Sequence, residues 1–152
     1  GLPGTSDKDE NKRLPMIWSD RGDEGETVGP SGCTIPRSSF AAVEQQLEDE
    51  TSLLNYFKRA LQLRNENPEI ARGEIKKIES LCTDQYGAMT KTYEGSTIGI
   101  VINNKHEEVQ ITLTDSELAD MNIRGYLTID GEVITLKDGV LTLPAKSICV
   151  LK

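Results

Sequence analysis

Two stretches of alternating residues decide the fold of this chain: Ile98-Gly99-Ile100-Val101-Ile102 and Val109-Gln110-Ile111-Thr112-Leu113-Thr114. In both, branched apolar side chains recur at every second position, which is the period of a β-strand with one buried face. The same alternation continues in shorter runs toward the C-terminus, at 127–129, 134–136, 141–143 and 148–150. Short strands at this spacing predict a β-sandwich.

Turn residues separate these runs. Glu94-Gly95-Ser96, Asn103-Asn104-Lys105, Asp130-Gly131 and Asp138-Gly139 each fall between two of them. The two Asp-Gly pairs predict type I′ hairpins, because this turn needs positive φ at its central residues. The single histidine, His106, lies in a polar run between two strands, where a hairpin tip is expected rather than a catalytic base.

A different period precedes the strands. Apolar side chains recur at three- and four-residue steps between Leu53 and Leu61, which predicts an amphipathic helix. Asp49 or Thr51 is expected to cap its start, and Pro68 cannot continue it. The helix is expected to bury Leu53, Phe57 and Leu61 against the sandwich or a second copy. Residues 1–40 hold four of the six prolines and several charge runs, and they read as loop.

Composition excludes several classes of partner and site. The chain has 25 acidic against 17 basic side chains and a net charge of -8, which disfavours nucleic acid and anionic membrane surfaces. The three cysteines, Cys33, Cys82 and Cys149, are far apart and odd in number, so free thiols are expected and a zinc site is not. Cys149 sits in an apolar run and is expected in the core.

Two motifs carry a family resemblance: Arg13-Leu14-Pro15-Met16-Ile17-Trp18 and, before the helix, Ser52-Leu53-Leu54. They resemble the end of the barrel in the α-amylase family of glycoside hydrolases (family 13). There, Arg-x-Pro-Met-x-Trp follows the eighth strand and Ser-Leu-Leu opens the eighth helix. The resemblance implies a mainly β fold, with an antiparallel Greek-key sandwich after a loop-rich segment and one long helix. Residues 1–72 would be the barrel remnant and 73–152 the C-terminal all-β domain.

The resemblance also implies what this chain does alone. With 152 residues it cannot hold a complete barrel of about 250 residues. The family's catalytic carboxylates lie on earlier strands, and no residue here matches their motifs. We therefore expect a parent enzyme acting on α-glucosidic bonds, and a fragment that is inactive and structural, with no catalytic residue, metal or cofactor. Its substrate, an α-glucan or α-glucoside, would be bound through the parent barrel.

Arg13 is the candidate substrate contact, because the corresponding arginine in some relatives reaches sugar from the loop after strand eight. A guanidinium donates several fixed hydrogen bonds, either to vicinal hydroxyls or to a neighbouring carboxylate that would only pin the loop. Asp9 is the second candidate, although Glu10 lies equally near the family's acidic position. Trp18 could stack on a sugar, but its place after Pro15-Met16 favours packing.

Two other functions remain open. A carbohydrate-binding module would need an aromatic platform, for which Tyr86, Tyr93 and Tyr126 are the residues of the β region. It fails unless two of them lie coplanar on one face. An interaction domain would use the apolar face of the helix, which could also support self-association.

Overall fold

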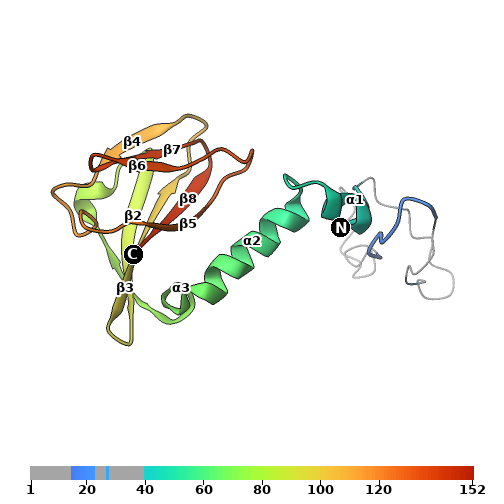
Figure 1. Ribbon diagram of the computed structural model, residues 1–152, viewed down its shortest axis with the longest axis horizontal. Helices are drawn as coiled ribbons and strands as arrows, with labels where there is room; N and C mark the ends of the chain where they lie inside the picture. Colours follow the sequence, from blue (N-terminus) through green and yellow to red (C-terminus); the bar gives the residue numbers. More distant parts are fainter. Residues whose placement is uncertain (1–14, 23–26, 28–39) are drawn as a thin grey trace, which may run out of the picture. The chain divides into compact units, whose positions relative to one another are not determined.

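The computed structural model describes residues 15–22, 27 and 40–152 of the chain (Figure 1). It contains two compact units, residues 1–55 and 56–152, and each is described here by itself. The division at residue 72 remains a prediction. None of the helices in the described part of the chain has the length and apolar content of a membrane span.

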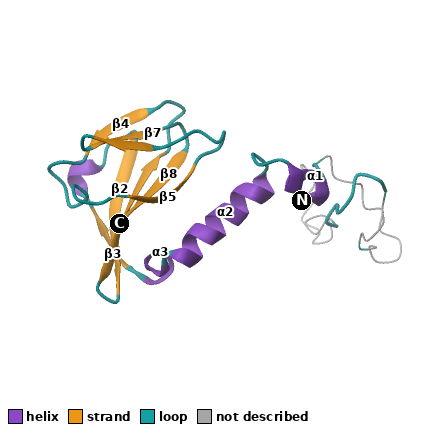
Figure 2. Ribbon diagram, viewed as in Figure 1, coloured by secondary structure: helices purple, strands orange, loops and turns teal. Residues whose placement is uncertain are grey.

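The β domain consists of two antiparallel sheets (Figure 2). One has five strands, in the order β1 (Glu74–Lys77), β2 (Tyr86–Tyr93), β3 (Ser96–Asn103), β8 (Ser147–Leu151) and β5 (Ile123–Leu127). The other has three, β4 (Val109–Thr112), β7 (Val140–Leu143) and β6 (Thr135–Lys137). A short 3₁₀ helix, η2 (Glu79–Leu81), joins β1 to β2. The predicted mainly β, antiparallel fold is confirmed.

The main core joins residues of both sheets. Val101 and Cys149 of the larger sheet pack in one cluster with Ile111, Leu141 and Leu143 of the smaller sheet, and all five are buried. Cys149 is therefore the core residue that the sequence predicts. The chain passes from one sheet to the other after β3, β4, β5 and β7, so the core is closed by residues far apart in sequence.

The turns agree with the prediction only in part. Asp138 and Gly139 have φ of 50° and 74° and join β6 to β7 as the expected hairpin. Gly131 has positive φ, at 75°, but Asp130 does not, and the segment joins strands of different sheets. The hairpin predicted there is wrong, as is the hairpin tip at His106, which lies between β3 and β4. Alternation marks the strands but does not show which strands pair.

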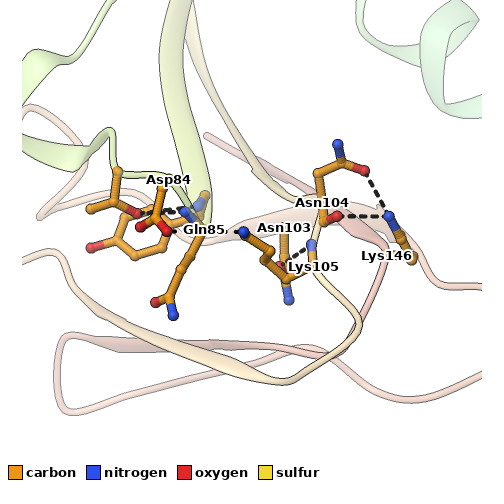
Figure 3. A network of polar contacts seen from close by, with 8 residues as sticks. Asp84, Gln85, Asn103, Asn104, Lys105 and Lys146 are labelled. Atoms are coloured by element: carbon orange, nitrogen blue, oxygen red, sulfur yellow. Dashed lines mark hydrogen bonds and ion pairs between the residues drawn. The ribbon is translucent and has the colours of Figure 1, made fainter.

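A buried asparagine, Asn103, holds the segment that connects β3 to β4. The Asn103 amide donates to the carbonyl of Pro144 at 2.8 Å, and its Oδ1 accepts from the Lys105 backbone N–H at 3.0 Å. Figure 3 shows how Lys146 completes the contact by donating to the Asn104 carbonyl at 2.7 Å. These bonds satisfy backbone groups where the chain leaves the sheet, which explains a buried polar side chain at this place.

In the part of the chain that the structure describes, three helices precede the strands: α1 (Val43–Glu48), α2 (Leu53–Glu66) and α3 (Pro68–Arg72). The predicted long helix is thus present as α2. Pro68 does not continue it and instead opens α3, where its missing N–H costs nothing.

The end of α2 and α3 cover the outer face of the larger sheet. Leu63 and Ile70 pack against Ile98, Ile100 and Val150, which form a second apolar cluster. A Cβ on Gly125 of β5 would lie only 2.5 Å from the Leu63 side chain, so the glycine permits this approach.

The expected burial of the other helix face against the sandwich is wrong, whereas its burial against a second copy stays a prediction. Leu53, Phe57 and Leu61 are 78%, 58% and 43% exposed, and the sandwich leaves Phe57 and Leu61 of its own unit uncovered. Because α2 contacts the sheet through Leu63, the stripe at positions 53, 57 and 61 is left open. The periodicity correctly marks an apolar face, and that face is exposed in the described part of the chain.

Candidate functional site

The segment Pro15–Gly22, which follows the Arg13 motif position, is bonded to the start of α1. The backbone N–H of Val43 donates to the Ile17 carbonyl at 2.9 Å, and that of Glu44 donates to the Trp18 carbonyl at 3.2 Å. The first N–H groups of a helix have no acceptor within it. Here the loop supplies two acceptors, and the buried Ile17 side chain anchors the same contact.

Glu44 holds the next two residues of this segment. Its Oε1 accepts from the Asp20 backbone N–H at 3.0 Å and from the Ser19 hydroxyl at 2.9 Å. These bonds favour the ionised carboxylate and lower the pKa of Glu44, the Asp20 bond most and the Ser19 bond next, with a smaller contribution from Arg21. The carboxylate is therefore a fixed acceptor at neutral pH.

Gln45 adds a further contact. Its side-chain Nε2 donates to Asp20 Oδ2 at 3.2 Å, and its Oε1 accepts from the Ala42 backbone N–H at 3.0 Å. The second bond is half of a capping box, the other half being absent because Ala42 has no side-chain acceptor. The Ser19 hydroxyl also accepts from the Arg21 backbone N–H at 3.1 Å. Residues 17–20 are thus held by α1 through two of its side chains, Glu44 and Gln45, and two backbone bonds.

The serine of the Ser-Leu-Leu motif has a structural role. Ser52 accepts from the Asn55 backbone N–H at 3.2 Å, so it is the cap of α2, and its hydroxyl donates to the Gln46 carbonyl at 2.6 Å. The Asn55 amide donates to the carbonyls of Gln46 and Asp49, both at 2.8 Å. The expected cap by Asp49 or Thr51 is wrong, because Asp49 instead accepts from both Thr51 N–H and hydroxyl groups within the connecting turn.

The two predicted substrate contacts, Arg13 and Asp9, lie outside the described residues, and their roles remain predictions. Trp18 is within them, and its side chain is half exposed rather than packed in a core. The sequence analysis did not identify Glu44, Gln45 and Asn55. Glu44 and Gln45 belong to an acidic run, which usually faces solvent, and Asn55 lies on the polar side of the predicted helix. For Gln45 the sequence holds one signal, its position three residues after Ala42, which is the spacing of a capping box. That signal is weak, because Ala42 is not one of the usual capping residues.

The tyrosines do not form a shared platform. Tyr86 packs against the core between the sheets. Tyr93, seven positions along the same strand, points to the opposite face. The Arg72 guanidinium lies 5.7 Å from the centroid of the Tyr93 ring and occupies one of its faces. Tyr126 pairs with Cys149 and so shares the face of Tyr86, but it belongs to β5 at the other side of the sheet.

The described residues contain no group of three His, Cys, Asp or Glu side chains placed to hold a metal ion. Of the cysteines, Cys82 and Cys149 are free thiols, and Cys33 lies outside the described residues. Burial raises the pKa of the Cys149 thiol to about 12, which makes it inert as a nucleophile.

Comparison with known proteins finds an α-glucosidase and an α-amylase among the relatives of this chain. The chain is 34% identical to the α-glucosidase MAL12 of Saccharomyces cerevisiae over 110 residues, which cover 68% of the chain and 19% of the relative. It is 28% identical over 148 residues to the α-amylase SusG of Bacteroides thetaiotaomicron, covering 91% of the chain and 21% of the relative. No protein-family model matches the chain.

The same relationship is seen in solved structures. Amy13B of Eubacterium rectale superposes with a TM-score of 0.85 at 31% identity and covers 97% of this chain. This chain corresponds to only 28% of that structure. The chain spans about a fifth of the length of the curated relatives it matches.

Proposed function

Because this chain belongs to the α-amylase family of glycoside hydrolases (family 13) and matches the C-terminal part of its members, we propose that it completes an enzyme acting on α-glucosidic bonds. In this proposal residues 1–72 belong to the catalytic barrel and residues 73–152 form the C-terminal domain. The chain itself is structural and catalytically inert.

The observation that carries the proposal is the uncovered stripe of α2. Leu53, Phe57 and Leu61 lie four residues apart on one face and are all exposed. An apolar stripe of this kind faces a core in globular proteins. The rest of a barrel would supply that core, because the helices of a barrel form a ring around its strands.

Three acids of the described residues are suited to be acceptors rather than proton donors. Retaining glycoside hydrolysis needs a carboxylic acid with a raised pKa near a second, ionised carboxylate. The acids of the described residues with a shifted pKa, Glu44, Asp49 and Glu69, are all shifted downward by hydrogen bonds. They are held ionised, which suits acceptors and ion pairs and does not suit a proton donor.

Arg13, with Asp9 as its partner, is the proposed substrate contact. The loops after barrel strands form the active-site face of this fold. Ser19 and Asp20, which follow Arg13 in the sequence, are bonded to α1 through Glu44 and Gln45. A guanidinium on such a loop can donate directional hydrogen bonds to sugar hydroxyls.

A non-catalytic α-glucan-binding module is the alternative, and the arrangement of the tyrosines does not favour it. Tyr86 is packed in the core, and Arg72 covers one face of Tyr93. Self-association through the stripe of α2 is a further proposal for the chain in isolation. Replacing Phe57 with lysine should then reduce the mass measured by light scattering to that of a monomer.

One experiment separates these functions. The chain is assayed for hydrolysis of a chromogenic α-glucoside and soluble starch, and the same preparation is tested for retention on insoluble starch. We expect neither turnover nor retention. Turnover would disprove the inertness of the chain, whereas retention without turnover would replace the structural role with that of a binding module.

A further inference from the structure

We propose that Asp130 is a site of spontaneous isoaspartate formation, and that the folded structure directs this reaction to Asp130 and away from Asp138. Each of the two residues is followed by a glycine, in Asp130-Gly131 and Asp138-Gly139, so their local chemistry is the same. The reaction needs no enzyme and does not depend on the proposed activity on α-glucosidic bonds. What separates the two sites is the structure around each dipeptide.

Isoaspartate forms in two steps at the peptide bond that follows the aspartate. In the first step, the backbone nitrogen of Gly131 attacks Cγ of the protonated Asp130 carboxyl group. The amide proton leaves with the carboxyl hydroxyl as water, and the product is a cyclic imide, a succinimide. In the second step, water adds to the main-chain carbonyl of this ring and the bond from that carbon to the nitrogen breaks. The chain then continues through Cβ of Asp130, and no oxidant, reductant or cofactor enters either step.

The first step needs an open approach to the glycine nitrogen. The Asp130 backbone must rotate until this nitrogen meets Cγ, and glycine has no side chain to hinder the rotation. Asp130 and Gly131 are both exposed and belong to no helix or strand. A Cβ built on Gly131 would find no atom within 4 Å, so the space around this residue is open.

The hydrogen bonds of this loop leave the reacting peptide free. Within the part of the chain that the structure describes, no hydrogen bond joins Asp130 or Gly131 to another residue. The loop is closed by its flanking residues instead, because the Thr128 hydroxyl donates to the Glu132 carbonyl at 2.9 Å. Rotation at Asp130 therefore breaks no hydrogen bond made by the dipeptide itself.

The second dipeptide is held in place. Asp138 and Gly139 form the turn of the β6–β7 hairpin, with φ of 50° and 74°, between the paired residues Lys137 and Val140. The Gly139 carbonyl also accepts from the Leu113 backbone N–H at 2.8 Å. Rotation of the Asp138 backbone would displace Gly139 and break this bond, so the hairpin must open locally before the reaction can start.

The test follows both sites in one preparation. The full chain is incubated at neutral pH, either folded or in concentrated guanidinium chloride, and its peptides are analysed by mass spectrometry over time. A peptide lighter by one water contains the succinimide, and electron-transfer fragmentation identifies isoaspartate by cleavage of its Cα–Cβ bond. Asp130→Glu and Asp138→Glu are the matched variants, because the longer side chain closes a ring far more slowly. Circular dichroism checks that each variant is folded.

We expect similar rates at the two sites in denaturant, where both dipeptides are unrestrained. In the folded chain Asp130 should react at least about tenfold faster than Asp138, which corresponds to about 1.4 kcal/mol for opening the hairpin. Asp130→Glu should remove most of the isoaspartate that the folded chain forms at these two sites, whereas Asp138→Glu should leave its amount unchanged.

Equal rates at the two sites of the folded chain, or a faster reaction at Asp138, would overturn this proposal. The same holds if folded Asp130 gives no product in the time that the denatured chain needs to react at both sites. A difference between the sites that persists in denaturant would assign the selectivity to the local sequence and would refute the directing role of the fold.

Discussion

The ammonium of Lys152 lies 2.8 Å from Oε1 of Glu69, although 83 residues separate the two in sequence. Glu69 is almost fully buried in α3, while Lys152 is the last residue of the chain and remains half exposed. Lys152 also exchanges two backbone hydrogen bonds with Asn122, each of 2.9 Å. The pair therefore fixes α3 to the end of the β domain, next to the apolar contact made by Ile70.

This ion pair makes the free energy of unfolding of the β domain depend on pH. The Lys152 bond and then the Ser96 hydroxyl lower the pKa of Glu69 from 4.5 to about 2. Because the folded-state pKa is depressed, the stabilisation is complete above pH 4.5 and is lost as the pH falls from 4.5 through 2. Urea unfolding between pH 6 and 2 should show a decrease in the free energy of unfolding of roughly 2 kcal/mol from this group.

Glu69→Gln is the variant that checks this assignment, since it keeps the shape and removes the charge. It should flatten the acid dependence, whereas Glu79→Gln, at an exposed position of η2, should keep it. A wild-type slope retained in Glu69→Gln would mean that another carboxylate produces the effect.

Removing only the Lys152 cation should lower the free energy of unfolding more than removing the charges of both Lys152 and Glu69. Lys152→Ala leaves the Glu69 carboxylate buried without its partner, and a buried unpaired charge is strongly unfavourable. We expect a loss of about 1–2 kcal/mol, moderated by the half-exposed position of Lys152. The double variant Glu69→Gln with Lys152→Ala should recover part of this loss in chemical denaturation. A double variant less stable than Lys152→Ala would contradict the ion-pair explanation.

Asn55 should control the stability of the connection between α1 and α2. Its amide donates to the carbonyls of Gln46 and Asp49, and Asn55→Ala removes both bonds, so that each carbonyl keeps the bond that Ser52 donates. The expected cost is about 1–2 kcal/mol, measured as faster amide exchange in α1. Asn65→Ala, an exposed position of the same helix, is the control and should leave exchange in α1 unchanged.

Gly73 should not tolerate a side chain. A Cβ there would lie 2.6 Å from the Glu69 carbonyl oxygen and 3.1 Å from the backbone nitrogen of Thr92, and backbone atoms cannot turn aside. We expect Gly73→Ala to lower the midpoint of thermal unfolding and to cost about 1–3 kcal/mol. Gly87→Ala, whose Cβ would meet only the Cys82 sulfur at 4.0 Å, should change the midpoint little. Equal effects of the two substitutions would show that crowding at Gly73 is not the cause.

The periodicity of the local sequence determines where the long helix and the main strands of this protein form. The alternation around Ile100 and Ile111 predicts strands, and the structure confirms both. The strand around Ile111 has one buried face, whereas the strand around Ile100 is buried on both faces. Residues 53–66 form the helix that the three- and four-residue spacing predicts. The Arg13 and Ser52 motifs likewise indicate the family, because motif spacing is a property of the chain itself.

Long-range contacts were decided only by the tertiary structure. Asp130-Gly131 resembles a hairpin turn in sequence, yet it joins two sheets, because pairing depends on which strands bury the core together. Glu44 and Glu69 look alike as residues of acidic, solvent-facing segments, but one accepts bonds from residues 19 and 20 and the other pairs with residue 152. The sequence by itself determined the periods and motifs, which depend on neighbours. Only folding could select the distant donor for each carboxylate, because hydrogen bonds and ion pairs depend on distance in space.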